Sequence, residues 1–165
     1  MPMLIQIQDI SQISYSAVMD LYSQDLRESA EKDYPSMSAP EALLAAEQDF
    51  YSFLADVFFQ TPQACMYVWR EDGKWVSCLR LEPYEDGLLI CGITTDPACR
   101  RCGYARMLLE AVLEMVDCPV YAHVEKSNVP SLALHSRCGF IRQLEYAKML
   151  NGEMLHNFCT FYRGK

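Results

Sequence analysis

The sequence lacks any apolar run near the roughly 20 residues needed to cross a bilayer, although 51% of its 165 residues are hydrophobic. Its start, MPMLIQIQDI, has no basic stretch followed by a long apolar core, so no signal peptide is expected. A basic surplus is missing too: the net charge is −8, which excludes nucleic acid as a partner because phosphate binding needs a basic surface. We therefore expect a cytoplasmic protein with no membrane partner. Without repeats or linkers, the length predicts a single domain over residues 1–165.

The eight cysteines show no sign of a disulfide framework, because nothing in the sequence indicates export. Most stand in apolar company, as in ACMYVW, LICGI and NFCTF, which predicts small buried side chains in a reducing compartment. Cys99 and Cys102 form a Cys-x-x-Cys pair, but a structural zinc site needs four ligands and a second close pair is missing. No metal is therefore expected. A redox role for the pair stays open, since a helix N-terminus lowers a thiol pKa.

The first third of the chain predicts one strand followed by two helical segments. The segment 3–8, MLIQIQ, alternates as a strand does, and the spacing from Ser14 to about Lys32 is helical. SAPE at 38–41 is a capping box, in which Ser38 caps a helix and Glu41 reaches back. That helix runs through EALLAAEQDFYSFLADVFF.

The rest of the chain predicts a sheet with helical connections. ACMYVWR and KWVSCLRLE flank Asp72-Gly73, and Asp86-Gly87 precedes LLICGITT, which together predict an antiparallel meander. YARMLLEAVLEMV is a largely buried helix, and the strand at 118–125 follows it, so crossover logic makes that strand parallel to its neighbour. VPSLALHSRCGF predicts a short helix, and a hairpin turned on Asn151-Gly152 closes a mixed α/β domain.

The stretch CRRCGYA lies where a strand ending near Thr95 passes through a glycine turn into a helix. This geometry binds anions, because free backbone N–H groups and the helix dipole point at the same place. Gly103 permits close approach, Ala105 keeps side-chain bulk away, and Arg100 and Arg101 add charge. An ordinary helix start is the alternative interpretation of these residues alone.

Two motifs in register resemble the core of the GNAT superfamily of acetyl-CoA-dependent N-acetyltransferases, in particular the branch that acetylates protein N-terminal or lysine amines. The family's pyrophosphate signature, Gln/Arg-x-x-Gly-x-Gly/Ala, is matched by Arg100, Gly103 and Ala105. Its second signature, an asparagine after a strand and a short helix ending in Gly-Phe, is matched by Asn128 and Gly139-Phe140. The resemblance implies a mostly antiparallel twisted sheet of about seven strands, splayed between strands 4 and 5 and flanked by about four helices.

The same resemblance implies acetyl-CoA as cosubstrate, held between LLICGITT and PVYAHVE, with Gly92 marking a bulge at the splay. Asn128 contacts the cofactor arm in the family, although a helix cap is the simpler interpretation. Backbone groups of two segments are implied to bind the pantetheine and the pyrophosphate: Ile93, Thr94 and Thr95 for the first, and Arg101, Cys102, Gly103, Tyr104, Ala105 and Arg106 for the second.

The expected catalytic residues depart from the family pattern. Relatives carry a glutamate in the strand and a tyrosine in the following helix, whereas this sequence has His123 and His135, with the same spacing of twelve residues. A neutral histidine accepts a proton at pH 7, so His123 is the candidate base and His135 the candidate acid. Structural histidines are the alternative in both places. Other donors and bases stay open: Tyr104, Tyr121, Tyr146, Glu82 and Glu85.

The sequence therefore predicts an N-acetyltransferase that moves acetyl from acetyl-CoA to a primary amine by direct attack. A non-catalytic acyl-CoA-binding sensor or interaction module is the alternative, motivated by the loss of both usual catalytic residues. The acceptor is a small-molecule or peptide amine. Acidic residues on the first two helices suit a cationic acceptor, and a solvated helix face explains them equally. A monomer and a homodimer are both open.

Overall fold

The computed structural model describes residues 2–165. One mixed sheet runs through these residues in the spatial order β1–β2–β3–β4–β5–β9–β6, and a separate ribbon pairs β7 with β8. The strands of the main sheet are β1 (Met3–Ile7), β2 (Cys65–Glu71), β3 (Lys74–Tyr84), β4 (Gly87–Thr95), β5 (Val120–Glu125), β9 (Phe158–Arg163) and β6 (Ile141–Leu144). Within the described chain β4 and β5 are the one parallel pair, as the crossover through a helix requires.

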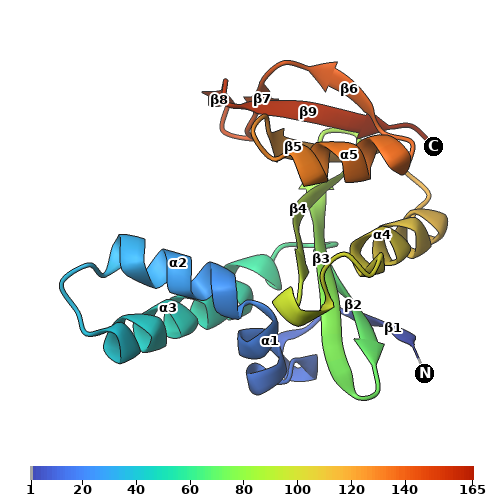
Figure 1. Ribbon diagram of the computed structural model, residues 1–165. Coiled ribbons are helices and arrows are strands. Elements are labelled where there is room, and N and C mark those ends of the chain that lie inside the picture. Colours follow the sequence, from blue (N-terminus) through green and yellow to red (C-terminus); the bar gives the residue numbers. More distant parts are fainter. Residues whose placement is uncertain (1) are drawn as a thin grey trace.

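Helices cover both faces of this sheet, as Figure 1 shows, with α1–α3 on one side and α4 on the other. The helices are α1 (Tyr15–Leu21), α2 (Ser23–Asp33), α3 (Ala39–Phe53), α4 (Tyr104–Met115) and α5 (Val129–Arg137). Short helical turns are η1 (Ile10–Gln12), η2 (Leu54–Phe58) and η3 (Pro97–Cys99), and the small ribbon consists of β7 (Ala147–Lys148) and β8 (Met154–Leu155).

Two apolar cores follow from strand alternation. On β3, Cys78 belongs to the cluster under α1–α3, while Leu79 and Leu81 belong to the cluster under α4. From α4, Leu108 and Leu109 enter the second cluster and are fully buried. Burying one such leucine side chain stabilises the fold by about 1.5–3 kcal/mol. The rigid sheet between these cores positions the candidate site.

The predicted fold class is confirmed, with differences in detail. The helix expected from Ser14 to about Lys32 is broken at Tyr22, so five α-helices replace the expected four. The Tyr22 ring is buried and packs 4.7 Å from the Phe50 ring, centroid to centroid. Its hydroxyl donates to the Cys78 thiol. The break is confined to Tyr22, whose φ and ψ of −90° and 10° depart from the helix.

The end of α3 departs from regular helical geometry. The capping box at Ser38 and Glu41 forms as predicted, but the helix finishes in a π-helical turn over η2. There the Phe59 N–H donates to the Leu54 carbonyl oxygen, five residues earlier. The wider turn directs both Leu54 and Phe58 into the core, where neither is more than 1% exposed. Such single π-turns are frequent near functional sites.

The closing segment also differs from the single hairpin that the sequence predicts. The turn at Asn151-Gly152 closes only the short β7–β8 ribbon. The following strand, β9, enters the main sheet between β5 and β6. Burial explains the difference, because Cys159, Thr160 and Phe161 are each at most 3% exposed and need a strand on either side.

Candidate active site

The site begins where β4 and β5 separate. The two strands pair only over Leu88–Ile90 and Val120–Ala122. The next residues, Cys91 and His123, are the first without a partner across this gap, although both strands continue. Backbone groups of β4 that face the gap beyond Ile90 therefore have no partner on β5 and are free to bind a ligand's amides.

A bulge lies at the same point. On β3, Arg80 pairs with Gly92 and Leu81 pairs with Ile90, so Cys91 is the extra residue of β4. This confirms the bulge expected near Gly92. A β-carbon added at Gly92 would stand 3.3 Å from an Arg80 side-chain nitrogen, so the glycine also makes room for that arginine.

The loop from Arg100 to Gly103 leads into α4, and backbone N–H groups without acceptors in the described chain gather at this N-terminus. Gly103 is the N-cap of α4, with a φ of +83° that only glycine adopts easily, and no side chain caps the helix. Among the described residues, no acceptor bonds the backbone N–H groups from Arg101 to Arg106. Unbonded donors at the positive end of a helix dipole, as at α4, are suited to binding an anion.

A cavity of about 620 Å³ lies in front of these donors. The predicted cofactor-binding residues line it with one exception, Cys102, whose side chain is exposed and whose thiol faces the Arg100 carbonyl oxygen. The lining members are Ile93, Thr94, Thr95, Arg101, Gly103, Tyr104, Ala105, Arg106 and Asn128. Arg100 and Cys99 line it as well.

One carboxylate stands inside this otherwise basic cavity. Asp25, from α2, accepts a hydrogen bond from the Thr94 hydroxyl at 3.3 Å. Burial raises the pKa of the Asp25 carboxyl, which the Thr94 hydrogen bond partly opposes. Asp25 belongs to the acidic residues of the first two helices, which suit a cationic acceptor, and the fold brings it to the cavity in front of the α4 N-terminus.

The two predicted catalytic histidines line one cavity of about 390 Å³, together with Glu82 and the β7–β8 ribbon residues Met149 and Leu155. This cavity shares Ile93, Asn128 and Ser131 with the larger one, so the two adjoin at the strand gap. Glu85, the other alternative base, lies in a separate cavity with Tyr84 and Asp86.

His123 is half-buried on β5. Its ring stands edge-on to Tyr84, with centroids 5.2 Å apart and an interplanar angle of 86°. Its Nε2 atom is buried and has no hydrogen-bond partner among the described residues. Burial lowers the pKa of the ring, so His123 is neutral at pH 7 and has a lone pair available.

His135 is more deeply buried, on α5, and only 3% exposed. Its Nδ1 atom lies 2.7 Å from the Ser131 carbonyl oxygen. Burial lowers the pKa of this ring too, although the bond to Ser131 opposes the shift. Its Nε2 atom is buried without a partner in the described part of the chain.

The tyrosines considered as alternative acids are already engaged. Tyr104 donates its hydroxyl to Glu71, which raises the pKa of the phenol to about 12. Tyr121 donates to Asp86 at 2.6 Å, which also raises its pKa. The Tyr146 ring packs against His156, with centroids 6.1 Å apart. Neither Tyr104 nor Tyr121 has a proton free for a leaving group.

Asn128 acts as a helix cap and lies at the site as well. Its side-chain oxygen accepts from the Ser131 N–H at 3.2 Å and starts α5. It also lines both adjoining cavities. The two interpretations of this residue are therefore compatible.

Of the Cys-x-x-Cys pair, Cys99 lines the cavity in front of the α4 N-terminus and Cys102 does not, and neither forms a disulfide. Its redox role stays a prediction. Over residues 2–165, no group of three or more metal-binding side chains comes together. In the same range no helix is both long and apolar enough to cross a membrane.

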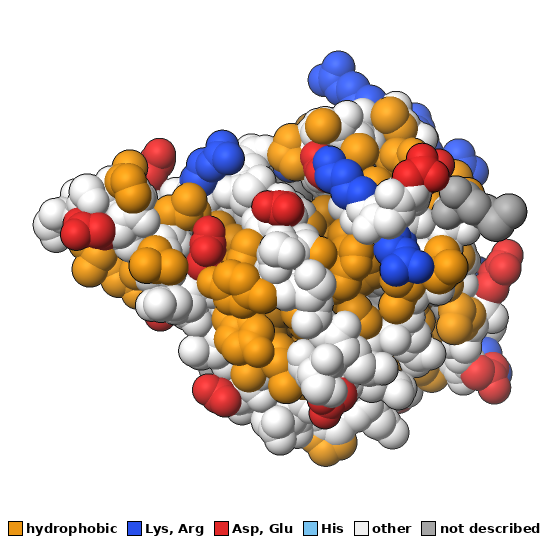
Figure 2. All heavy atoms as spheres, turned by 90° about the horizontal axis from the view of Figure 1, so that it is seen from below, with side chains coloured by type: hydrophobic (Ala, Val, Ile, Leu, Met, Phe, Trp, Pro, Cys, Tyr) orange, Lys and Arg blue, Asp and Glu red, His pale blue; other side chains and the backbone are white. Residues whose placement is uncertain are grey.

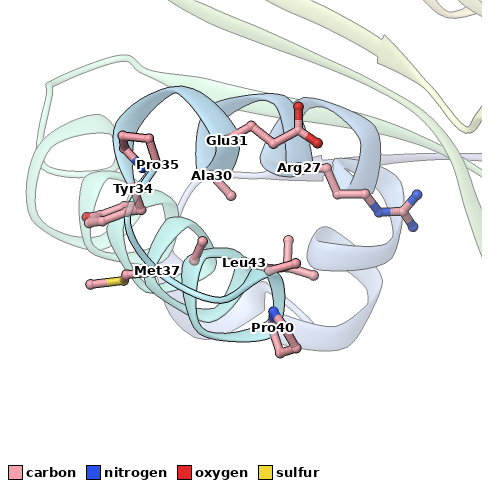
Figure 3. A pocket seen from close by; sticks show the side chains of 10 residues that line it. Arg27, Ala30, Glu31, Tyr34, Pro35, Met37, Pro40 and Leu43 are labelled. Carbon is pink, nitrogen blue, oxygen red and sulfur yellow. The ribbon is translucent and has the colours of Figure 1, made fainter.

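A further cavity of about 580 Å³ lies between α2, α3 and their connection (Figure 3). In the close-up, Tyr34, Pro35 and Met37 border one end and Arg27 stands at the other. None of the predicted site residues lines it. Acidic side chains on the face in Figure 2 are scattered among hydrophobic and uncharged ones, so that face shows no acidic patch for a cationic acceptor.

Comparison with known families agrees with this geometry. The model of the acetyltransferase (GNAT) family matches residues 19–140, which is more than half of the chain. The protein therefore belongs to the GNAT acetyltransferase family, whose members act on amine acceptors such as proteins or small molecules. A search of curated proteins found no match.

Solved structures share the fold at low sequence identity. An IAA acetyltransferase from Bacillus cereus aligns over 100% of both chains at 15% identity and a TM-score of 0.63. The ribosomal-protein-S18-alanine N-acetyltransferase from Escherichia coli aligns over 99% of this chain and 94% of its own, at 17% identity and a TM-score of 0.62. PaiA N-acetyltransferase from Thermoplasma acidophilum, solved in complex with coenzyme A, aligns over 99% of each chain at 10% identity and a TM-score of 0.63.

Proposed function

We propose that this protein transfers acetyl from acetyl-CoA to a primary amine, with His123 as the general base. The main observation behind the proposal is that two cavities adjoin at the gap between β4 and β5. One holds the unbonded N–H groups of the α4 N-terminus, and the other holds the unpartnered ring nitrogen of His123.

The residues present suit a CoA thioester. The free N–H groups from Arg101 to Arg106 match a pyrophosphate, with Arg100 and Arg101 adding positive charge. The unpaired edge of β4 over Ile93–Thr95 matches the amides of a pantetheine arm. When bound, the cosubstrate supplies an acetyl thioester. Asn128, shared by both cavities, borders the passage between them.

His123 solves the protonation problem of the acceptor. An alkyl amine with a pKa of about 10.4 is neutral in only about one part in a thousand at pH 7.4. His123 takes the proton from the ammonium, directly or through one water, and releases the nitrogen lone pair. The amine nitrogen then bonds to the acetyl carbon, the carbon–sulfur bond breaks, and the sulfur leaves with the electron pair and takes up the proton that the new amide nitrogen releases.

We propose a role for His135 other than the acid role that the sequence predicts. A carbonyl oxygen only accepts hydrogen bonds, so the bond to Ser131 places the proton of the neutral ring on Nδ1. Its Nε2 atom is then an acceptor, and donation to a thiolate requires the doubly protonated ring that burial disfavours. We propose that His135 holds a water or a cosubstrate N–H through Nε2.

Calorimetric titration with acetyl-CoA, desulfo-CoA and CoA, followed by an amine screen for release of free CoA, tests the function. Micromolar binding with amine-dependent turnover supports it. Binding without turnover of any amine supports the sensor alternative, and absence of binding contradicts both. His123→Ala should lose rate and keep acetyl-CoA affinity, whereas the exposed His156→Ala serves as the matched control.

A further inference from the structure

Arg80 is a cation without a counter-charge in the interior of the domain. It lies on β3, is mostly buried, and forms no ion pair with any residue in the described range. Its Nε atom is fully buried without a hydrogen-bond partner there. Interior arginines normally pair with a carboxylate, because an isolated buried charge is costly. In the strand sequence SCLRL, Arg80 is the one charged residue among small and apolar ones.

An aromatic cage holds the guanidinium in place. The guanidinium carbon lies 5.9, 5.6 and 5.3 Å from the ring centroids of Phe50, Phe53 and Phe58, respectively. These distances are within the range of cation–π attraction. The π-helical turn after Phe53 sets the ring directions, since Phe58 belongs to that turn. Two uncommon features, an interior arginine without a carboxylate partner in the described range and a π-turn, thus meet at one place.

This place borders the cavity of the two histidines. Gly92 lines that cavity, and the Arg80 side chain stands over Gly92. Glu82, two residues further on the same face of β3, also lines it. Alternate residues of a strand share a face and lie about 6.6 Å apart along it. Glu82 therefore places a negative group in the cavity wall, and Arg80 places a positive group beside that wall, at Gly92.

We propose that Arg80 binds a carboxylate of the acceptor, so that the acceptor is an amino acid or a small amino-acid derivative. Glu82 then binds the ammonium before His123 deprotonates it. This inference rests on the acetyl transfer proposed above. Apolar residues line the remaining wall, including Met149, Leu155 and Phe158, and favour an apolar side chain on the acceptor. The acceptor is then zwitterionic, rather than simply cationic as the acidic helices suggest.

A comparison of acids with their amides tests the carboxylate site without requiring turnover. The CoA-loaded protein is titrated calorimetrically with N-acetyl-L-leucine, N-acetyl-L-methionine and N-acetyl-L-phenylalanine, and with the corresponding N-acetyl amides. We expect at least one acid to bind about tenfold or more tightly than its amide, as a charge-assisted hydrogen bond provides. In Arg80→Met this ratio should fall to about one, and in Arg80→Lys to an intermediate value.

Arg142→Met is the matched control, because Arg142, on β6, forms an exposed ion pair with Glu145 and the substitution removes the same charge. It should leave the ratio unchanged. Equal affinity for acid and amide in the wild type overturns the proposal, as does absence of binding by every pair. An unchanged ratio in a folded Arg80→Met protein overturns it as well. If Arg80→Met does not fold, the ratio of acid to amide affinity in the wild type and in Arg80→Lys still tests the proposal.

Kinetics separate this inference from the proposed function. The kcat/KM ratio of L-leucine to L-leucinamide is compared between wild type and Arg80→Met, so that the different amine pKa values of acid and amide cancel. Acetylation of amides as fast as acids supports the acetyltransferase and contradicts the carboxylate site. Acid-selective binding without any transfer supports the carboxylate site and contradicts the acetyltransferase.

Discussion

The Nδ1 atom of His135 lies 2.7 Å from the Ser131 carbonyl oxygen, one helical turn earlier on α5. This bond fixes the tautomer of a ring that is 3% exposed and leaves Nε2 buried without a partner among residues 2–165. The helix therefore presents an acceptor to the strand gap. The geometry also makes His135 a group whose ionisation opposes folding.

Replacing His135 should change how stability depends on pH. Burial lowers the pKa of its ring, so below about pH 6.5 the unfolded chain binds a proton that the folded chain does not. The free energy of unfolding is therefore greatest above that pH. It falls as the pH decreases towards the pKa of the folded state, by at most about 1.4 kcal/mol per pH unit for one histidine. In His135→Phe this decline should be shallower, as urea unfolding at pH 7.0 and 5.5 measures. The exposed His156→Phe should keep the wild-type decline, and an identical decline in both variants contradicts the assignment.

His123 should control the acidic limb of the rate profile. Burial lowers its pKa, so the neutral base persists below pH 6.5 and kcat/KM should fall only on the acidic side of that value. In His123→Ala we expect a loss of about 10²–10⁴ in kcat, with the limb absent and the acetyl-CoA Kd unchanged. Steady-state rates between pH 5 and 9 measure this. If the fall in kcat/KM at acidic pH persists in the variant, another group is the base. Glu82, which lines the same cavity, is then the candidate.

Gly103→Ala should weaken cofactor binding by more than its strain explains. At a φ of +83° an alanine costs about 1–2 kcal/mol, and the new methyl group meets no protein atom within 4 Å. Gly152 has a φ of +90° and equally open surroundings in the β7–β8 turn, so Gly152→Ala is a control for strain. We expect both variants to lose similar stability by thermal melting, while only Gly103→Ala loses about tenfold or more in CoA affinity. Equal CoA affinity in both would contradict the phosphate role of the loop.

Asp25→Asn should strengthen acetyl-CoA binding. The Asp25 carboxylate lines the cavity proposed for phosphates, and an amide oxygen can still accept from the Thr94 hydroxyl. Removing one negative charge should lower the Kd several-fold at low salt and less at high salt, because screening weakens such repulsion. Glu28→Gln, on the exposed side of the same helix, should have a smaller effect. Weaker binding in Asp25→Asn would instead show that the carboxylate orders β4 through Thr94.

The loop proposed to bind an anion could be predicted from local sequence because its residues are contiguous. Gly103 and the α4 N-terminus lie within one short stretch, and both the glycine conformation and the free N–H groups follow from local backbone geometry. The capping box at Ser38 and the strand alternation of β3 are predictable for the same reason. The helix break at Tyr22 and the π-turn could not be predicted in this way. Both depend on which aromatic rings are buried, and the helical spacing of the sequence does not show that.

The sequence by itself determined the family and most of the order of strands and helices along the chain, and it predicted the residues of a cofactor loop, since each depends on neighbours along the chain. Only the tertiary structure decided which distant side chains meet. It brought Asp25 to the cavity in front of the α4 N-terminus, engaged Tyr104 with Glu71, and set Arg80 among three phenylalanine rings beside the histidine cavity. The physical reason is that packing across the sheet joins residues tens of positions apart, and burial then sets their charge and their partners.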